Sequence, residues 1–223
     1  MSMNISRNNR GFTLVELLVS MTTMVVILGS AVALTQQIQN GYRRQLEDSA
    51  AEQEARYALD WIGRYVRGAA NNPTGAATTN CPALNTNVAA VQFDPNNDDV
   101  DSDVRLMTDA NPPDGLFGGA AAACNQANED VTISLDNAAN TITFLDNNTG
   151  GAVSTRTDTV IEDLRFIFRD SGHNALVTTL PGNQGNVVYI ETRITIRTRT
   201  IDASSGQPMT RTLSSEVKIR SRG

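Results

Sequence analysis

The chain has 223 residues, of which 40 % are hydrophobic, and this suggests one domain with an additional segment. Its formal net charge is −6, and Lys218 is its only lysine. This composition argues against nucleic-acid binding, which needs clustered cations to neutralise phosphates. It also argues against docking on anionic lipid headgroups through a basic face.

The first element in chain order is an apolar run from Phe12 to Leu34, in which Glu16 is the only charged residue. A helix of that length would rise about 34 Å, enough to cross a hydrocarbon core of about 30 Å. Arg7 and Arg10 precede the run. The positive-inside rule therefore predicts a cytoplasmic N-terminus and an exported C-terminal part.

Three interpretations of this run compete. A cleaved signal peptide would use "AVA" at 31–33 as its cleavage site, but the run exceeds the usual apolar region of about 7–15 residues. A plain membrane anchor explains the length but not Glu16, since a carboxylate costs roughly 2.5–3.5 kcal/mol on insertion scales. The third interpretation is a short basic leader that is removed while the apolar segment remains.

The stretch "RGFTLVELLV" at 10–19 resembles the prepilin signature of type IV pilins and type II secretion pseudopilins. In that superfamily a prepilin peptidase cuts after the glycine and methylates the new amino terminus. The resemblance implies a leader at residues 1–11, cleavage between Gly11 and Phe12, and N-methylation of Phe12. It also implies a single-pass precursor in the bacterial inner membrane, which then joins a filament in the periplasm or outside the cell.

The same resemblance gives Glu16 a role in subunit assembly. Cleavage would create an amino group at Phe12, which stays positively charged after methylation, and Glu16 follows it by one helical turn. The carboxylate would pair with this amine in its own chain or in a neighbouring subunit. We expect the helix at 12–34 to contact other major and minor pilins, together with the inner-membrane assembly platform.

The helical pattern continues past the apolar run. Residues 35–70 predict an amphipathic continuation, because apolar residues recur at spacings of three, four and seven while charged residues fill the other face. The apolar positions are Tyr42, Leu46, Ala50, Tyr57, Ala58, Trp61, Ile62, Tyr65 and Val66. The stretch "NNP" at 71–73 ends the pattern, and we expect Trp61 and Tyr65 to pack against a sheet.

Residues 71–223 predict an exported β-rich domain, which opens with a loop at 71–87. Alternating apolar residues predict strands at 88–93, in a hairpin at 131–146, and at 160–172, 186–202 and 211–222. Short turns between successive strands favour an antiparallel meander. The predicted fold class is therefore α+β, a pilin-like fold in which one long N-terminal helix packs on an antiparallel β-sheet.

The C-terminal half resembles a narrower group. A strand that ends in "FRDSG", a long strand rich in arginine and threonine and a final "VKIR" strand are similar to minor pilins of the PilW type and pseudopilins of the GspJ type. This implies a structural subunit that primes or joins assembly of a type IV pilus, or else a minor pseudopilin of a type II secretion system. A tip subunit that adheres or binds DNA is a further alternative, and the acidic composition disfavours DNA binding.

The sequence predicts a protein that is not an enzyme and has no organic cofactor. His173 is the only histidine and falls in the turn "DSGHN", so no Ser-His-Asp or Cys-His arrangement is expected. There is no phosphate-binding glycine motif, and "GNQGN" at 182–186 is expected to be a turn. Four arginines alternate with Thr and Ile and are expected on the exposed face of a strand: Arg193, Arg197, Arg199 and Arg211.

The acidic segment at 94–109 is the candidate ligand cluster. Oxygen-bearing side chains that suit Ca²⁺ are those of Asp94, Asn96, Asp98, Asp99, Asp101 and Asp103. Against calcium, the sixth position of this loop is Asp99 rather than glycine, and the twelfth is Arg105 rather than glutamate. The alternative is a solvated acidic loop without a metal.

Cys81 and Cys124 are the two cysteines of the chain. Exported proteins form disulfides, so we expect the pair to be bonded, whereas in the cytosol the same residues would be two thiols. The bond would close a loop of about 44 residues, and the chain-entropy model gives roughly 4 kcal/mol for such a loop.

Overall fold

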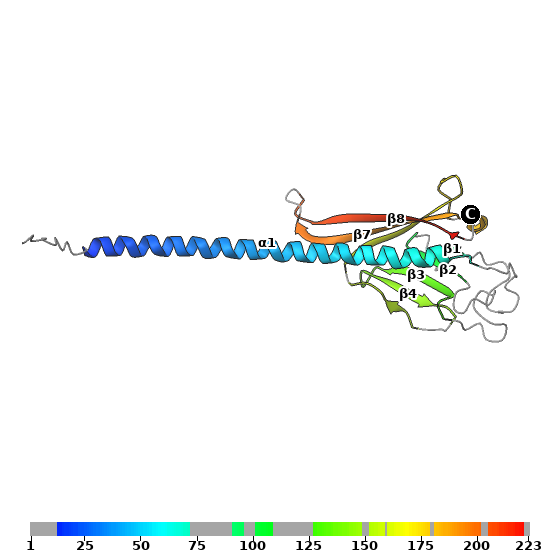
Figure 1. Ribbon diagram of the computed structural model, residues 1–223, viewed down its shortest axis with the longest axis horizontal. Coiled ribbons are helices and arrows are strands. Elements are labelled where there is room, and N and C mark those ends of the chain that lie inside the picture. The colour runs from blue at the N-terminus through cyan, green and yellow to red at the C-terminus, as the bar shows by residue number, and fades with distance from the viewer. Residues whose placement is uncertain are drawn as a thin grey trace, which may run out of the picture. The chain divides into compact units, whose positions relative to one another are not determined.

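The computed structural model describes residues 13–71, 91–95, 101–108, 127–148, 152–158, 160–178, 181–201 and 205–220. The chain divides into two compact units, Met1–Leu46 and Glu47–Gly223. Its elements are shown in Figure 1 and are, in chain order, α1 (Leu14–Gly68), β1 (Val91–Phe93), β2 (Asp103–Met107), β3 (Asp130–Asp136), β4 (Thr141–Asp146), β5 (Ser154–Thr155), β6 (Ile161–Arg169), the 3-10 helix η1 (Pro181–Asn186), β7 (Tyr189–Ile201) and β8 (Pro208–Lys218).

The strands form two antiparallel sheets, and this arrangement with α1 confirms the α+β class. One sheet has the order β1-β2-β3-β4-β5, and the other has the order β6-β7-β8. The expected hairpin at 131–146 is β3 and β4, joined by a turn in which Asp136 Oδ1 accepts from Ala138 N at 2.9 Å and Ala139 N at 3.1 Å. The meander is thus divided between two sheets rather than continuous.

The C-terminal part of α1 explains why two sheets are needed. Its buried residues are Ala51, Ala55, Ala58, Leu59, Trp61, Ile62, Gly63 and Val66. At about 100° per residue they cover an arc of roughly 200°, twice the width of an ordinary amphipathic stripe. A helix buried over so wide an arc packs against more than one layer.

Contacts on two sides of α1 show this packing directly. The Trp61 ring meets Phe144 of β4 edge-on, with ring centroids 6.3 Å apart. A Cβ atom built on Gly63 would lie 3.4 Å from Cγ2 of Val217 in β8, so the helix backbone approaches this strand closely. Within the second unit, α1 lies between β7–β8 and β3–β4 (Figure 1).

The two sheets share one hydrophobic core. Phe93 of β1 and Phe168 of β6 have ring centroids 4.3 Å apart, so aromatic packing joins the sheets. The backbone also links them, since Phe166 N donates to the Asp101 carbonyl at 2.8 Å. These contacts join the two sheets, and the buried residues of α1 belong to the same core.

Several expected positions differ in the structure. Tyr57 and Leu46 are exposed, whereas Ala51 and Ala55 are buried although the predicted stripe did not include them. The segment at 94–109 is not a loop throughout, because residues 103–107 form β2, which lies between β1 and β3 in the first sheet. The last strand begins at Pro208 and ends at Lys218 rather than spanning 211–222.

Candidate functional site

The helix α1 begins with a reciprocal set of hydrogen bonds between Thr13 and Glu16. Thr13 N donates to Glu16 Oε2 at 2.9 Å, and Thr13 Oγ1 donates to the same oxygen at 3.0 Å. Glu16 N in turn approaches Thr13 Oγ1 at 3.3 Å. This is a capping box, in which the residue before the helix and the third helical residue satisfy each other's backbone N–H groups.

Thr13 is the functional residue that reasoning from the sequence missed. The signal was present, because "TLVE" at 13–16 has the pattern of Ser or Thr followed three residues later by Glu or Gln. The box makes Thr13 the N-cap, so α1 begins at Leu14, two residues after Phe12, which cleavage would make the first residue of the mature chain. The helix start and the expected cleavage point are therefore close together in the sequence.

The capping box leaves one oxygen of Glu16 available. Both bonds from Thr13 end on Oε2, whereas Oε1 accepts no hydrogen bond from any residue that the structure describes. The carboxylate is exposed in the chain by itself. Its position is thus fixed by the box, while its second oxygen remains accessible to a cation from outside.

The other polar side chains of the apolar run are satisfied within the helix. The hydroxyl groups that donate to carbonyl oxygens three or four residues earlier, at 2.7–3.1 Å, belong to Ser20, Thr22, Thr23, Ser30 and Thr35. Such bonds let hydroxyl groups enter an apolar medium without unpaired donors. Glu16 differs from all five because it carries a charge.

The first unit exposes an apolar surface. The described large apolar side chains between Leu14 and Leu34 are each more than half exposed, from 54 % at Leu28 to 79 % at Leu14. By length and composition α1 contains a segment that can cross a membrane. So large an apolar surface is expected to be covered by lipid or by other helices.

Most of the other predicted site residues lie outside the residues that the structure describes. These are Gly11, Phe12, Cys81, Cys124, Asn96, Asp98 and Asp99. The disulfide and the cleavage site therefore remain predictions. Among the acidic residues, Asp94, Asp101 and Asp103 are described.

The described acidic residues do not form a metal site. Asp103 is fully buried at the start of β2, opposite Ser134 of β3, so the solvated acidic loop is wrong for this residue. Within the described residues, no group of three or more His, Cys, Asp or Glu side chains is placed to hold a metal ion. Strand pairing separates alternate side chains onto opposite faces of the sheet.

The expected exposed arginines occupy two faces of the second sheet. Arg193 and Arg197 lie on the outer face, where they pair with Glu191 at 2.6 Å and Glu162 at 2.8 Å. Arg211 instead forms an ion pair with Glu52 of α1, so it lies on the face toward the helix. Arg199 belongs to β7, but its side chain lies outside the described part.

His173 lies beside an ion-pair network on the outer face of the second sheet. Its Nδ1 lies 3.2 Å from Glu216 Oε1, and its ring stacks on Tyr189 with centroids 4.1 Å apart. Arg169 joins Glu191 at 2.6 Å and Glu216 at 3.2 Å. The bonds from Arg193 and Arg169 hold the pKa of Glu191 below its ordinary value.

Residues 6–32 match the family model of the prokaryotic N-terminal methylation motif, the signal of type IV pilin-like prepilins. No curated protein and no solved structure matches the chain. The matched segment contains Gly11, Phe12, Thr13 and Glu16. The motif implies processing by prepilin peptidase and assembly with other pilins, and together with the apolar helix it fits a membrane-anchored precursor.

Proposed function

We propose that this chain is a minor prepilin, a structural subunit that primes or joins assembly of a type IV pilus. The observation that carries the proposal is the start of α1, where a capped helix and a carboxylate with one accessible oxygen lie inside the matched methylation motif. The similarity of the C-terminal strands to minor pilins of the PilW type supports the minor role.

The proposed processing step is hydrolysis of the Gly11–Phe12 peptide bond by prepilin peptidase on the cytoplasmic side of the inner membrane. Water adds across the bond, which leaves a carboxylate on Gly11 and an amino group on Phe12. The amino group then receives a methyl group from a methyl donor, whose bond to the methyl carbon breaks, and the resulting secondary amine is protonated and keeps its positive charge. The new charge is on the residue before Thr13, whose backbone N–H and hydroxyl donate to the Glu16 carboxylate.

Glu16 then provides a reason for subunits to associate. An unpaired carboxylate in a membrane-spanning helix costs roughly 2.5–3.5 kcal/mol. Pairing Glu16 Oε1 with the amine of Phe12, in its own chain or in the next subunit, offsets part of this cost. Pairing between chains also fixes how far one helix is displaced along the next, which sets the spacing of the filament.

Two matched variants distinguish the role of the Glu16 charge in assembly from the role of the helix cap at Thr13. Glu16→Gln removes the charge but keeps an acceptor that capping boxes use, whereas Thr13→Ala removes the cap and keeps the charge. We expect the Glu16→Gln protein to be cleaved and inserted but to enter filaments at about a tenth of the wild-type level or less, because a loss of ~1.4 kcal/mol per contact is already tenfold. The Thr13→Ala protein should enter filaments at a level closer to wild type.

The measurement is the ratio of tagged protein in sheared filaments to tagged protein in the membrane. Normal incorporation of the Glu16→Gln protein would contradict the proposed role of the charge.

A deletion strain distinguishes the two candidate systems. Loss of surface fibres and twitching supports the pilus, whereas accumulation of secreted proteins in the periplasm would identify a minor pseudopilin of the GspJ type.

A further inference from the structure

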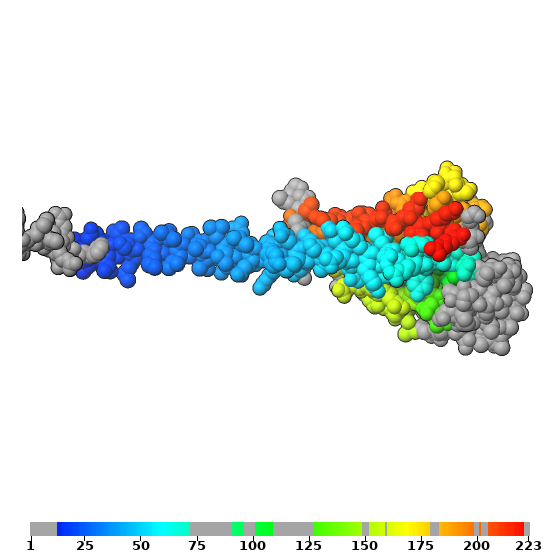
Figure 2. All heavy atoms as spheres, viewed as in Figure 1, coloured from blue at the N-terminus to red at the C-terminus, as the bar shows by residue number. Residues whose placement is uncertain are grey.

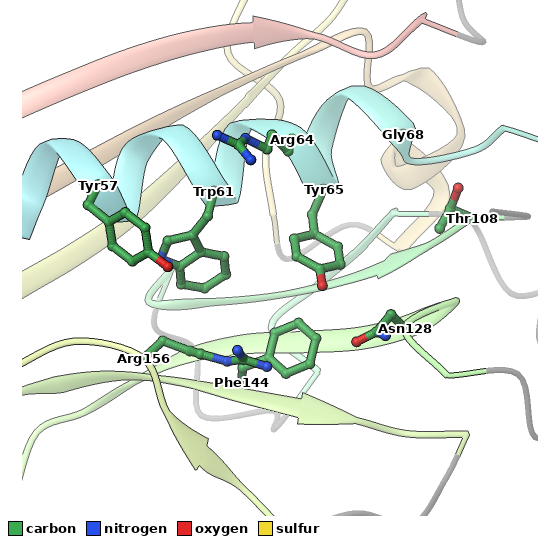
Figure 3. Close-up of a pocket in the computed structure, with 9 residues that line it drawn as sticks. All are labelled: Tyr57, Trp61, Arg64, Tyr65, Gly68, Thr108, Asn128, Phe144 and Arg156. Atoms are coloured by element: carbon green, nitrogen blue, oxygen red, sulfur yellow. The ribbon is translucent and has the colours of Figure 1, made fainter. Parts of the chain in front are cut away.

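The second unit contains a pocket of about 450 Å³ beside the last turns of α1 (Figure 3). Its lining residues are Tyr57, Trp61, Arg64, Tyr65, Gly68, Thr108, Asn128, Phe144 and Arg156. The volume falls within the range of roughly 300–1,000 Å³ that is typical of ligand pockets. Nothing in the proposed function uses this pocket, and the inference below does not depend on that function.

One wall of the pocket is aromatic and already packed. Tyr57, Trp61 and Tyr65 follow one another at four-residue intervals on α1, so their side chains emerge on the same side of the helix (Figure 3). Tyr65 and Phe144 have ring centroids 5.3 Å apart, and Trp61 contacts both rings edge-on at 6.2 and 6.3 Å. The rings hold each other in place, which lowers the entropy cost of binding.

Tyr57 is the outermost ring of this wall. Its side chain is largely exposed, at 61 %. Figure 2 shows the last turns of α1 at the surface next to β8. The three rings lie on the other side of these turns and point toward Phe144 of β4 (Figure 3). An exposed aromatic ring beside a buried aromatic cluster offers apolar area that a partner's side chain can cover.

The charged groups that line the pocket are cationic. Arg156 lies with its guanidinium carbon 4.5 Å from the centroid of the Phe144 ring, and it forms no ion pair with any carboxylate in the described ranges. Arg64, on the opposite wall, pairs with Asp60. Burial raises the pKa of Tyr65, the guanidinium of Arg156 opposes that change, and the carboxylate of Asp146 adds to it.

We infer that this pocket binds a short acidic peptide segment of a partner protein. An aromatic or large aliphatic side chain of the segment packs on the wall of Tyr57, Trp61 and Tyr65, and an adjacent Asp or Glu carboxylate pairs with Arg156. A wall of Trp and Tyr flanked by Arg is the composition of protein-interface hot spots. Arg is also the residue best suited to bind a carboxylate through two parallel N–H groups.

A single-stranded nucleic acid would also offer an anion and an aromatic group. The observations favour a peptide for two reasons. The chain carries a net charge of −6, which repels a ligand with a phosphate at every residue. The pocket also offers one cationic side chain without an ion-pair partner among the described residues, Arg156, and this suits a single carboxylate better than a series of phosphates.

Trp61 is the only tryptophan of the chain, so its fluorescence reports on this pocket alone. The full-length protein in detergent micelles, which contain no other protein, is titrated with the peptide acetyl-Phe-Asp-Leu-amide and, separately, with acetyl-Phe-Asn-Leu-amide. We expect a saturable change in emission with the acidic peptide. The neutral peptide should bind about tenfold more weakly, because a hydrogen bond to a charged group is replaced by a neutral one.

Two arginine variants test whether the preference for the acidic peptide depends on Arg156. Arg156→Gln should weaken binding of the acidic peptide by about tenfold and leave binding of the neutral peptide unchanged. Arg165→Gln is the matched control, because Arg165 is exposed on β6 and does not line the pocket, and it should change neither titration. The circular dichroism spectrum of each variant verifies that it is folded.

The outcomes that would overturn the inference are specific. They are the absence of a saturable change in Trp61 emission, equal affinity for the two peptides, and equal effects of the two arginine variants. Tighter binding of an oligothymidine than of the acidic peptide would also overturn it, in favour of a nucleic-acid site.

Discussion

The pair formed by Arg105 and Asp130 is the most buried ion pair among the described residues. Arg105 Nε donates to Asp130 Oδ1 at 2.7 Å, and Arg105 Nη2 donates to Oδ2, so the pair is bidentate. The Asp130 side chain is only 2 % exposed, and its carboxylate raises the pKa of Arg105. Asn147 adds a third hydrogen bond to the carboxylate at 2.9 Å.

We predict that Asp130→Ala lowers the free energy of unfolding by about 3–5 kcal/mol, because it leaves a partly buried guanidinium without its partner. The control is Asp163→Ala, which breaks the exposed pair with Arg165 and should cost no more than about 1 kcal/mol. Urea denaturation of both variants measures the difference. Similar losses for the two variants would contradict the account.

Glu191 makes the outer face of the second sheet sensitive to acid. Its pKa in the folded state lies below the ordinary value of 4.5, because Arg193 and Arg169 donate hydrogen bonds to its carboxylate. A carboxylate with a lowered pKa stabilises the fold above its ordinary pKa, and this contribution is lost as the pH falls through the folded value. The loss should therefore begin near pH 4.5 and grow at lower pH.

We predict that Glu191→Gln flattens this acid response. The melting temperature of the wild type should fall more steeply between pH 5 and pH 3 than that of the variant, although the variant is less stable at neutral pH. Thermal melts monitored by circular dichroism across this range provide the test. Parallel curves of melting temperature against pH for the two proteins would show that Glu191 does not contribute to the acid sensitivity.

At the scale of elements, the closeness of α1 to the sheets depends on small residues. Ala55 and Ala58 are fully buried where the helix backbone meets the sheets. We predict that Ala55→Leu destabilises the fold by about 1–3 kcal/mol through overpacking, whereas Gln53→Leu, on the exposed face of the same turn, changes stability little. Chemical denaturation compares them, and equal stabilities would argue against close packing at Ala55.

Most of the elements could be predicted, and the exceptions have physical causes. Alternating apolar residues identified β3, β4, β6 and β7, because one face of each of these strands meets the core. β2 was missed since Asp103 and its acidic neighbours hide the alternation of Val104 and Leu106. The division into two sheets was missed because the predicted stripe did not include Leu59 and Gly63, which widen the buried face of the helix.

The candidate site was also predictable only in part. Glu16 stands out as a charge inside an apolar run, and its partner Thr13 belongs to a recognisable capping pattern. The pocket beside α1 has no comparable signal. Trp61 and Phe144 are far apart in the sequence, and the cationic lining depends on where Arg156 is placed by the short strand β5.

At the scale of the whole molecule, the two units present different kinds of surface. The described residues of the first unit expose large apolar side chains, whereas the second unit buries a core of helix and sheet residues and exposes ion pairs. The first surface suits lipid and neighbouring helices, and the second suits water. This division is what a membrane-anchored precursor with an exported domain requires.

The mass of the N-terminal peptide of the mature protein, isolated from cells with an active prepilin peptidase, tests the central claim most directly. We predict a peptide that begins at Phe12 and carries one added methyl group. A peptide that still contains residues 1–11 would contradict the account, and so would one that begins at Leu34, after the small residues at 31–33.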